Sequence, residues 1–202
     1  VWRTVGLHPH NAAEATPDIR DRLRALADGP DVVGIGESGL DYHYDYAPRA
    51  VQAASFEAHL DVAAETGLPL VVHTREAEAD TLAILRNFAG RARGVLHCFT
   101  GSRAMAEAGV DLGYHVSFSG VITFKRSDDL RATAAAMPED RLLVETDSPY
   151  LAPVPFRGKP CQPAYVAHTA TALAGARGVD AETIAAVTSA NFAALFPKTA
   201  NA

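Results

Sequence analysis

Six short apolar runs, each ending in a polar residue, constrain this chain more than any other feature of its 202 residues. Runs of Val, Ile and Leu of this length are typical of strands that are buried on both faces. The runs end at His8, Glu37, His73, His97, Ser119 and Asp147. Polar groups that follow successive buried strands are typical of the active-site end of an α/β barrel. The pattern therefore predicts a fold class and the position of a site together.

The segments between the apolar runs have helical patterns, with Pro or Ser near several starts and Gly near several ends. The spacing predicts helices over residues 18–28, 48–65, 76–88, 102–108, 127–136, 163–176 and 181–195. In the last of these helices, we expect Ile184, Val187, Phe192 and Leu195 to face the core. Regular alternation of strands and helices indicates a parallel sheet.

The number of strand–helix units favours an incomplete closed barrel. Such barrels have eight units in about 250 residues, and this chain contains six. We predict a TIM-like (β/α)8 barrel that forms a single domain over residues 1–202. An open doubly wound sheet is the alternative. The segment 34–39 superficially matches the G-x-G-x-x-G loop of nucleotide-binding sheets, but its glycines flank a carboxylate, which argues against that function.

Composition limits the classes of partner and the compartment. The net charge of −6 argues against a generally basic nucleic-acid-binding chain, although bound divalent ions can supply local positive charge. No apolar stretch approaches the roughly 20 residues of a membrane-spanning helix. The two cysteines, Cys98 and Cys161, make no disulfide framework, which is the usual situation in a reducing compartment. We expect a monomeric cytoplasmic protein without a membrane partner.

Four of the residues that end the runs have the chemistry of metal ligands: Glu37, His73, His97 and Asp147. A site that activates water with divalent ions needs imidazole and carboxylate groups that converge from rigid elements. A single histidine after a strand is more often a hydrogen-bonded structural residue. Four such residues at the same place in their units are much harder to explain structurally, so we predict that they bind metal.

The motifs around these residues sharpen the prediction. In order along the chain they read G-L-H-P-H (6–10), G-E-S-G-L-D-Y-H (36–43), H-T-R-E-A (73–77), H-C-F-T-G (97–101), V-S-F-S-G-V-I-T-F-K (116–125) and E-T-D-S-P-Y-L-A-P (145–153). With this set the chain strongly resembles the TatD family of metal-dependent hydrolases, from about Thr4 to the last helix. The motifs are highly specific as a set.

The resemblance implies a two-metal site in a TIM-like barrel, with Mg²⁺ as the expected ion and Mn²⁺ or Zn²⁺ as alternatives. It implies that Glu37 is shared between the metals and that His73 and His97 bind one of them. Asp147 would be a further ligand and the general base for the attacking water. Because family members act as deoxyribonucleases, often 3′→5′ exonucleases, the implied substrate is DNA. A small ester, amide or lactone is the alternative substrate.

Further residues near the motifs are candidates for binding the substrate. Arg75 lies two residues beyond His73, and we expect it to grip a phosphate through two hydrogen bonds. For His8, three roles stay open: positioning the scissile phosphate, protonating a leaving group, or supporting the metal ligands. Tyr42 and Tyr150 either stack on a base or pack in the core.

One family motif, an H-x-H pair on the opening strand, is absent from this sequence. The chain begins at Val1, directly in a strand pattern, so we expect an upstream segment that carries this pair. If the protein begins at Val1, we expect weak metal binding and little activity. An inactive fragment or a binding module is therefore a third alternative.

Overall fold

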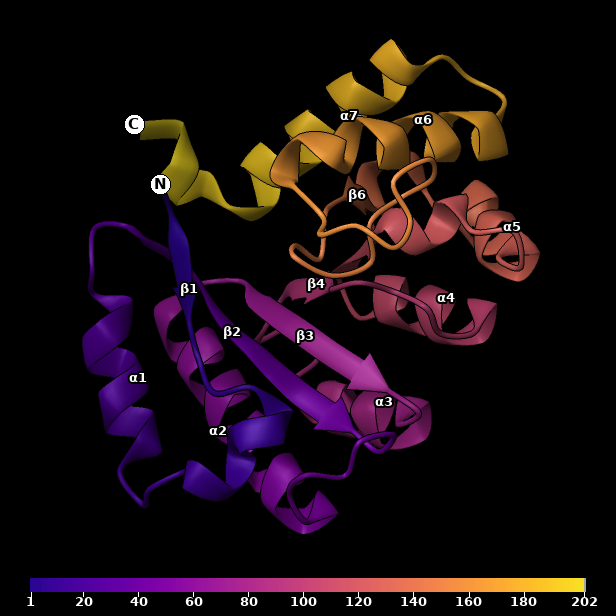
Figure 1. Cartoon of the computed structure of the whole chain (residues 1–202). Helices are drawn as coiled ribbons and strands as arrows, with labels where there is room; N and C mark the ends of the chain where they lie inside the picture. Colours follow the sequence, from indigo (N-terminus) through magenta and orange to yellow (C-terminus); the bar gives the residue numbers. More distant parts are fainter. Residues whose placement is uncertain (202) are drawn as a thin grey trace. The chain divides into compact units, whose positions relative to one another are not determined.

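The computed structural model describes residues 1–201 (Figure 1). These residues form two compact units. The first holds Val1–His97, Asp111–Tyr114 and the residues from Leu195 onward, and the second holds Cys98–Val110 and His115–Ala194. The single barrel domain expected over residues 1–202 stays a prediction.

A parallel sheet is the centre of the first unit. Its strands, in the order in which they pair, are β1 (Arg3–Val5), β2 (Val32–Asp41), β3 (Leu70–Arg75) and β4 (Gly94–Leu96). Figure 1 shows β1, β2 and β3 side by side. Nine of the ten residues of β2 are buried, as expected for a strand inside a parallel sheet.

The close approach of β2 to β3 requires glycine. Gly36 and Gly39 have φ angles of +119° and +149°, which L side chains rarely adopt. A Cβ atom at Gly39 would collide with the carbonyl oxygen of His73. The pairing register also shifts between Gly36 and Ser38, which leaves Glu37 without a partner in β3. Such irregularities re-aim a side chain, and here they set the direction of the Glu37 carboxylate.

The sequence pattern places Glu37 at the end of a strand, and this prediction is wrong. β2 continues past Glu37 to Asp41. The apolar run stops at Glu37 in the sequence, but the glycines and the buried Leu40 beyond it continue the strand. The site residues of β2 therefore extend over more of the strand than the pattern indicates.

Helices cover the sheet of the first unit. α1 (Ile19–Ala27) and α2 (Arg49–Thr66) pack against β2 and against each other, and α3 (Glu78–Asn87) packs against β3 (Figure 1). Phe56 and Leu60 of α2 are completely buried, and each apolar side chain of this size stabilises the fold by about 1.5–3 kcal/mol. Gly67 stops α2, as the sequence predicts: it follows the last helical residue as a left-handed cap, and its N–H donates to the carbonyl of Ala63. The unit also contains the 3₁₀ helices η1 (Pro9–Glu14) and η5 (Pro197–Asn201).

In the second unit, β5 (Tyr114–Phe118) pairs in parallel with β6 (Leu142–Val144). Its helices are α4 (Arg103–Asp111), α5 (Asp128–Ala136), α6 (Val166–Arg177) and α7 (Ala181–Leu195), with 3₁₀ turns η2 (Gly120–Thr123), η3 (Glu139–Arg141) and η4 (Pro163–Tyr165). Arg177 at the end of α6 donates to the carbonyls of Ala134 and Met137, both at 2.9 Å. This contact satisfies carbonyl groups at the carboxyl end of α5, which has no further helical turn to bond them.

All seven predicted helices are present among the described residues, with ends within three residues of the expected positions. The prediction for Phe192 is wrong, because this residue is 41% exposed whereas Ile184 and Leu195 are buried. Phe192 lies eight positions after Ile184, which turns it about 80° away from the buried stripe. Neither Cys98 nor Cys161 forms a disulfide. Among the residues described, no helix combines the length and the apolar character that crossing a membrane would need.

Candidate metal centre

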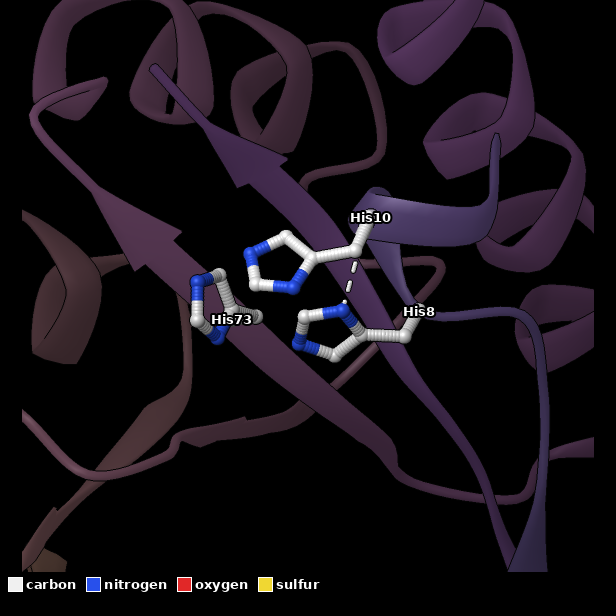
Figure 2. Close-up of side chains that lie close together, drawn as sticks. All are labelled: His8, His10 and His73. Carbon is white, nitrogen blue, oxygen red and sulfur yellow. Dashed lines mark hydrogen bonds between the residues drawn. The ribbon is translucent and has the colours of Figure 1, made fainter. Parts of the chain in front are cut away.

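The loop after β1 brings two histidines to the carboxyl end of the first unit's sheet. His8 precedes η1, and its Nδ1 accepts the backbone N–H of His10 at 3.2 Å. Because Nδ1 accepts this hydrogen bond, the proton of the neutral ring lies on Nε2. This Nε2 lies 3.5 Å from Oε1 of Glu37. The rings of His8 and His10 have centroids 4.3 Å apart. Figure 2 shows both rings beside that of His73.

His73 on β3 lies between two carboxylates of β2. Its Nδ1 is 2.8 Å from Oε1 of Glu37, and its Nε2 is 3.0 Å from Oδ2 of Asp41. The close pairing of β2 with β3 produces this arrangement, because Gly39 stands opposite His73 in the register. Both nitrogens of this imidazole are therefore within hydrogen-bond distance of a carboxylate.

Oε1 of Glu37 faces three imidazoles. Besides His73 and His8, it lies 3.8 Å from Nε2 of His97, the residue that directly follows β4. Burial alone would raise the pKa of the Glu37 carboxyl, but the hydrogen bonds from His73 and His8 outweigh it and hold that pKa well below its usual range. Glu37 is therefore an anion surrounded by imidazoles that can donate hydrogen bonds or carry positive charge.

Asp41 is the most deeply buried acid of the site, with 1% of its side chain exposed. Its Oδ2 lies 2.8 Å from Nε2 of His10, and its Oδ1 accepts the backbone N–H groups of His43 and Tyr44 at 3.0 and 2.9 Å. Burial alone would raise the pKa of Asp41, but the Tyr44 N–H and the neighbouring imidazoles lower it to about 2. Asp41 stays ionised and orients the rings of His10 and His73.

We call these residues the histidine–carboxylate cluster: His8, His10, Glu37, Asp41, His73 and His97. One ring nitrogen from each of His8, His10 and His73 lies within 4.8 Å of the others. Their side chains are half-buried, and Glu37 is 29% exposed, so solvent reaches the cluster. Imidazole and carboxylate groups on rigid elements are the ligands that divalent transition metals and Mg²⁺ use in proteins. The donor set therefore fits a divalent cation.

The structure places the remaining predicted residues as follows. Arg75 is exposed at the end of β3, with its guanidinium carbon 4.9 Å from the centroid of the Tyr44 ring. Asp147 lies in the second unit, in the loop after β6, where it is half-buried and its carbonyl accepts the N–H of Tyr150 at 2.7 Å. Ser119 is completely buried and accepts a hydrogen bond from the thiol of Cys98 at 3.2 Å.

Sequence reasoning missed His10 and Asp41. His10 is two residues after His8, and the tight turn that begins at Pro9 brings both rings to the same side. The signal for Asp41 is the run G-L-D that follows Ser38, where an acid comes after a buried leucine within the same strand as Glu37. A buried acid needs partners, and here the partners are histidines.

Comparison with known proteins assigns the family. Residues 1–197 match the family described as TatD related DNase. The chain belongs to the TatD family. A TatD-like relative, the uncharacterized metal-dependent hydrolase YcfH of Escherichia coli K12, is 50% identical over 192 residues, which cover 95% of this chain and 72% of YcfH. The protein named 3′-5′ ssDNA/RNA exonuclease TatD of Citrobacter koseri is 39% identical over 201 residues, which cover 96% of this chain and 77% of that protein.

A solved structure supports the same assignment. The crystal structure of YJJV, a TatD homolog from Escherichia coli K12, matches with a TM-score of 0.89 and 31% identity, covering 97% of this chain and 76% of that one. The fold class predicted from the sequence, a TIM-like α/β fold of the metal-dependent hydrolase type, is confirmed. The resemblance to the TatD family is confirmed as well, and with it the prediction of a metal-dependent hydrolase.

Proposed function

We propose that this TatD family protein is a metal-dependent phosphodiesterase that removes nucleotides from the 3′ ends of single-stranded DNA. The observation that carries the proposal is the Glu37 oxygen, which faces the imidazoles of His8, His73 and His97 in a part of the molecule open to solvent. The relatives named 3′-5′ ssDNA/RNA exonuclease support the choice of substrate.

We propose that Glu37, His73, His97 and Asp147 bind two divalent ions, with Mg²⁺ first and Mn²⁺ or Zn²⁺ as alternatives. When bound, such ions lower the pKa of a water molecule and neutralise charge on phosphate oxygens. The imidazoles of the cluster suit Zn²⁺, whereas its carboxylates suit Mg²⁺ and Mn²⁺. His10 and Asp41 would hold the ring of His73 in place, since Asp41 contacts both imidazoles.

The other residues have proposed roles in moving protons and binding phosphate. Asp147 would accept a proton from the attacking water. His8 would position the scissile phosphate or protonate the leaving oxygen, because its side chain is 30% exposed and its Nε2 lies 3.5 Å from the Glu37 carboxylate. Arg75, exposed at the end of β3, would bind a substrate phosphate through its planar guanidinium.

The substitution Asp147→Asn tests the proposal. We expect hydrolysis of a 3′-labelled single-stranded oligonucleotide, in Mg²⁺ or Mn²⁺, to fall by about 10²–10⁴-fold, which is the usual contribution of a general base. Circular dichroism and the thermal midpoint should change little. The matched control is Asp129→Asn, which alters an exposed acid of α5 in the same unit. Full activity of the Asp147→Asn protein would rule out its role as the base.

The same protein preparation tests whether the substrate is DNA or a small molecule. Wild-type protein is assayed with single-stranded DNA and with a panel of small esters, amides and lactones under the same metal conditions. Hydrolysis of the oligonucleotide alone supports the proposal. Hydrolysis of a small ester with the DNA left intact would replace it with the alternative activity.

A further inference from the structure

The segment between β2 and α2 is held in a defined shape beside the histidine–carboxylate cluster. Oδ1 of Asp41 accepts the N–H groups of His43 and Tyr44 and closes a tight turn. The buried amide of Gln52 donates to the carbonyls of Asp41 and Ala47, at 3.1 and 2.8 Å, and so joins the two ends of the segment. The rings that this segment carries are therefore presented on an ordered support.

Two of those rings form an exposed aromatic surface. Tyr44 and Tyr46 stack with centroids 5.4 Å apart and planes 20° from parallel. Their residues are 46% and 66% exposed. The ring of His10 stands nearly perpendicular to both, with centroids 5.1 and 4.9 Å away. We call Tyr44 and Tyr46 the tyrosine pair, and its contact with His10 places it at the cluster itself.

Neighbouring Tyr42 differs from the tyrosine pair. Its ring is covered by the guanidinium of Arg49 at 4.0 Å, and its hydroxyl donates to Asp80 at 2.7 Å. Tyr42 thus has the contacts of a structural residue, which favours packing over base stacking for this position. Tyr46, in contrast, is two-thirds exposed, so much of its ring surface is open to solvent.

The chemistry around the tyrosine pair fits an unpaired nucleobase with its phosphate. Stacked tyrosines offer a flat π surface that every base can match, and stacking of this kind tolerates any sequence. The guanidinium of Arg75 lies 4.9 Å from the centroid of the Tyr44 ring, so it is a cation that can reach a phosphate of the same nucleotide. In duplex DNA the base faces are already stacked on their neighbours, so only a single strand offers a free face.

We propose that the tyrosine pair is a stacking site for an unpaired base of a single-stranded nucleic acid, next to the phosphate that the cluster would cleave. The inference rests on the proposed phosphodiesterase function and adds to it the part of the substrate that is recognised. The site selects single strands over duplexes and favours no particular base.

Binding measurements on Tyr46→Ala and Tyr46→Phe test the site. Fluorescence anisotropy follows binding of a short single-stranded oligonucleotide, labelled at its 5′ end, in an Asp147→Asn background with Mn²⁺. We expect Tyr46→Ala to weaken binding within the range of roughly 5- to 150-fold that one stacked base contributes. Tyr46→Phe keeps the ring and should bind like the parent. Tyr46→Ala and Tyr46→Phe should bind equally well to an oligonucleotide whose last positions are abasic.

The matched control is Trp2→Ala. Trp2 is also an exposed aromatic residue of the first unit, but it precedes β1, at the opposite end of the strand from the cluster. The Trp2→Ala substitution should leave binding of the oligonucleotide unchanged. Equal binding by Tyr46→Ala and its parent overturns the proposal. A loss that is as large for the abasic strand as for the normal one also overturns it, because the tyrosine would then act on the backbone.

Failure of the stacking site differs from failure of the phosphodiesterase function. If only the stacking site is wrong, the wild-type protein cleaves single-stranded DNA and Tyr46→Ala leaves KM unchanged. If only the phosphodiesterase function is wrong, the wild-type protein leaves the strand intact, while the base-dependent loss of binding at Tyr46 persists.

Discussion

Histidines occur in two contrasting places within the first unit. In the histidine–carboxylate cluster, imidazoles that are 19–30% exposed face carboxylates. His59 on α2 is completely buried, and its partners belong to the backbone. Its Nε2 accepts the N–H of Leu7 at 2.9 Å, and its Nδ1 donates to the carbonyl of Ser55 at 2.7 Å.

The difference separates a structural histidine from a functional one. Both hydrogen-bonding positions of His59 are satisfied by fixed backbone groups, so its neutral form is the stable one, and burial lowers its pKa. The cluster instead concentrates ionised oxygens and imidazole nitrogens where solvent reaches them. The two places are linked, because Leu7 directly precedes His8 and the buried histidine anchors the loop that carries the exposed ones.

The largest effect should come from Glu37→Gln, which removes the negative charge that His8, His73 and His97 face. Loss of an outer partner of a metal ligand already costs about 10–100-fold in affinity or activity. For Glu37 as a proposed metal ligand, we expect a larger loss, about a thousandfold in kcat/KM at fixed metal concentration. Calorimetric titration with Mn²⁺ and the oligonucleotide assay measure the effect. Glu57→Gln, an exposed acid of α2, is the control; unchanged Mn²⁺ affinity in Glu37→Gln contradicts the ligand assignment.

His59→Ala should act on stability. The substitution leaves a cavity and removes the partners of the Leu7 N–H and the Ser55 carbonyl, so we expect a loss of about 2–4 kcal/mol in the free energy of unfolding. Urea denaturation of the metal-free protein measures it. His43→Ala removes an exposed histidine that pairs with Glu76 and should change stability by less than about 1 kcal/mol. If the two substitutions cost the same, His59 is not the structural histidine described above.

The sequence predicts the alternation of strands and helices because buried strands and amphipathic helices leave strong periodic patterns. It also predicts that Glu37, His73, His97 and Asp147 converge, since the ends of parallel strands share one edge of a sheet. The first three of these residues lie together in the first unit. It does not predict Asp41, because a buried acid and a loop acid look alike until their partners are known. The contacts of His10 depend on a 3₁₀ turn, and the exposure of Tyr46 depends on the Asp41 turn beside it. Such local geometry has no periodic signature.

The smallest effect is a pH dependence that distinguishes the two places in one titration of the metal-free protein. The folded-state pKa of His59 is lowered, so the unfolded chain binds more protons below about pH 6.5, and stability falls as the pH drops through that value. The pKa of Asp41 is lowered to about 2. Its contribution is therefore complete above about pH 4 and is lost as the pH falls toward 2.

The free energy of unfolding, measured in urea at about pH 7, 5 and 3, separates two losses of stability. The loss between about pH 7 and 5 reports His59, and the loss between about pH 5 and 3 reports Asp41 together with Glu37. His59→Gln should flatten the loss of stability between about pH 7 and 5 and leave the loss below about pH 5. Asp41→Asn should leave the first loss and only reduce the second, because the lowered pKa of Glu37 also contributes there. Asp129→Asn, exposed on α5, should preserve both. If Asp41→Asn instead removed the loss between about pH 7 and 5, the cluster rather than the buried histidine would control stability near neutral pH, and the separation between the two kinds of histidine would fail.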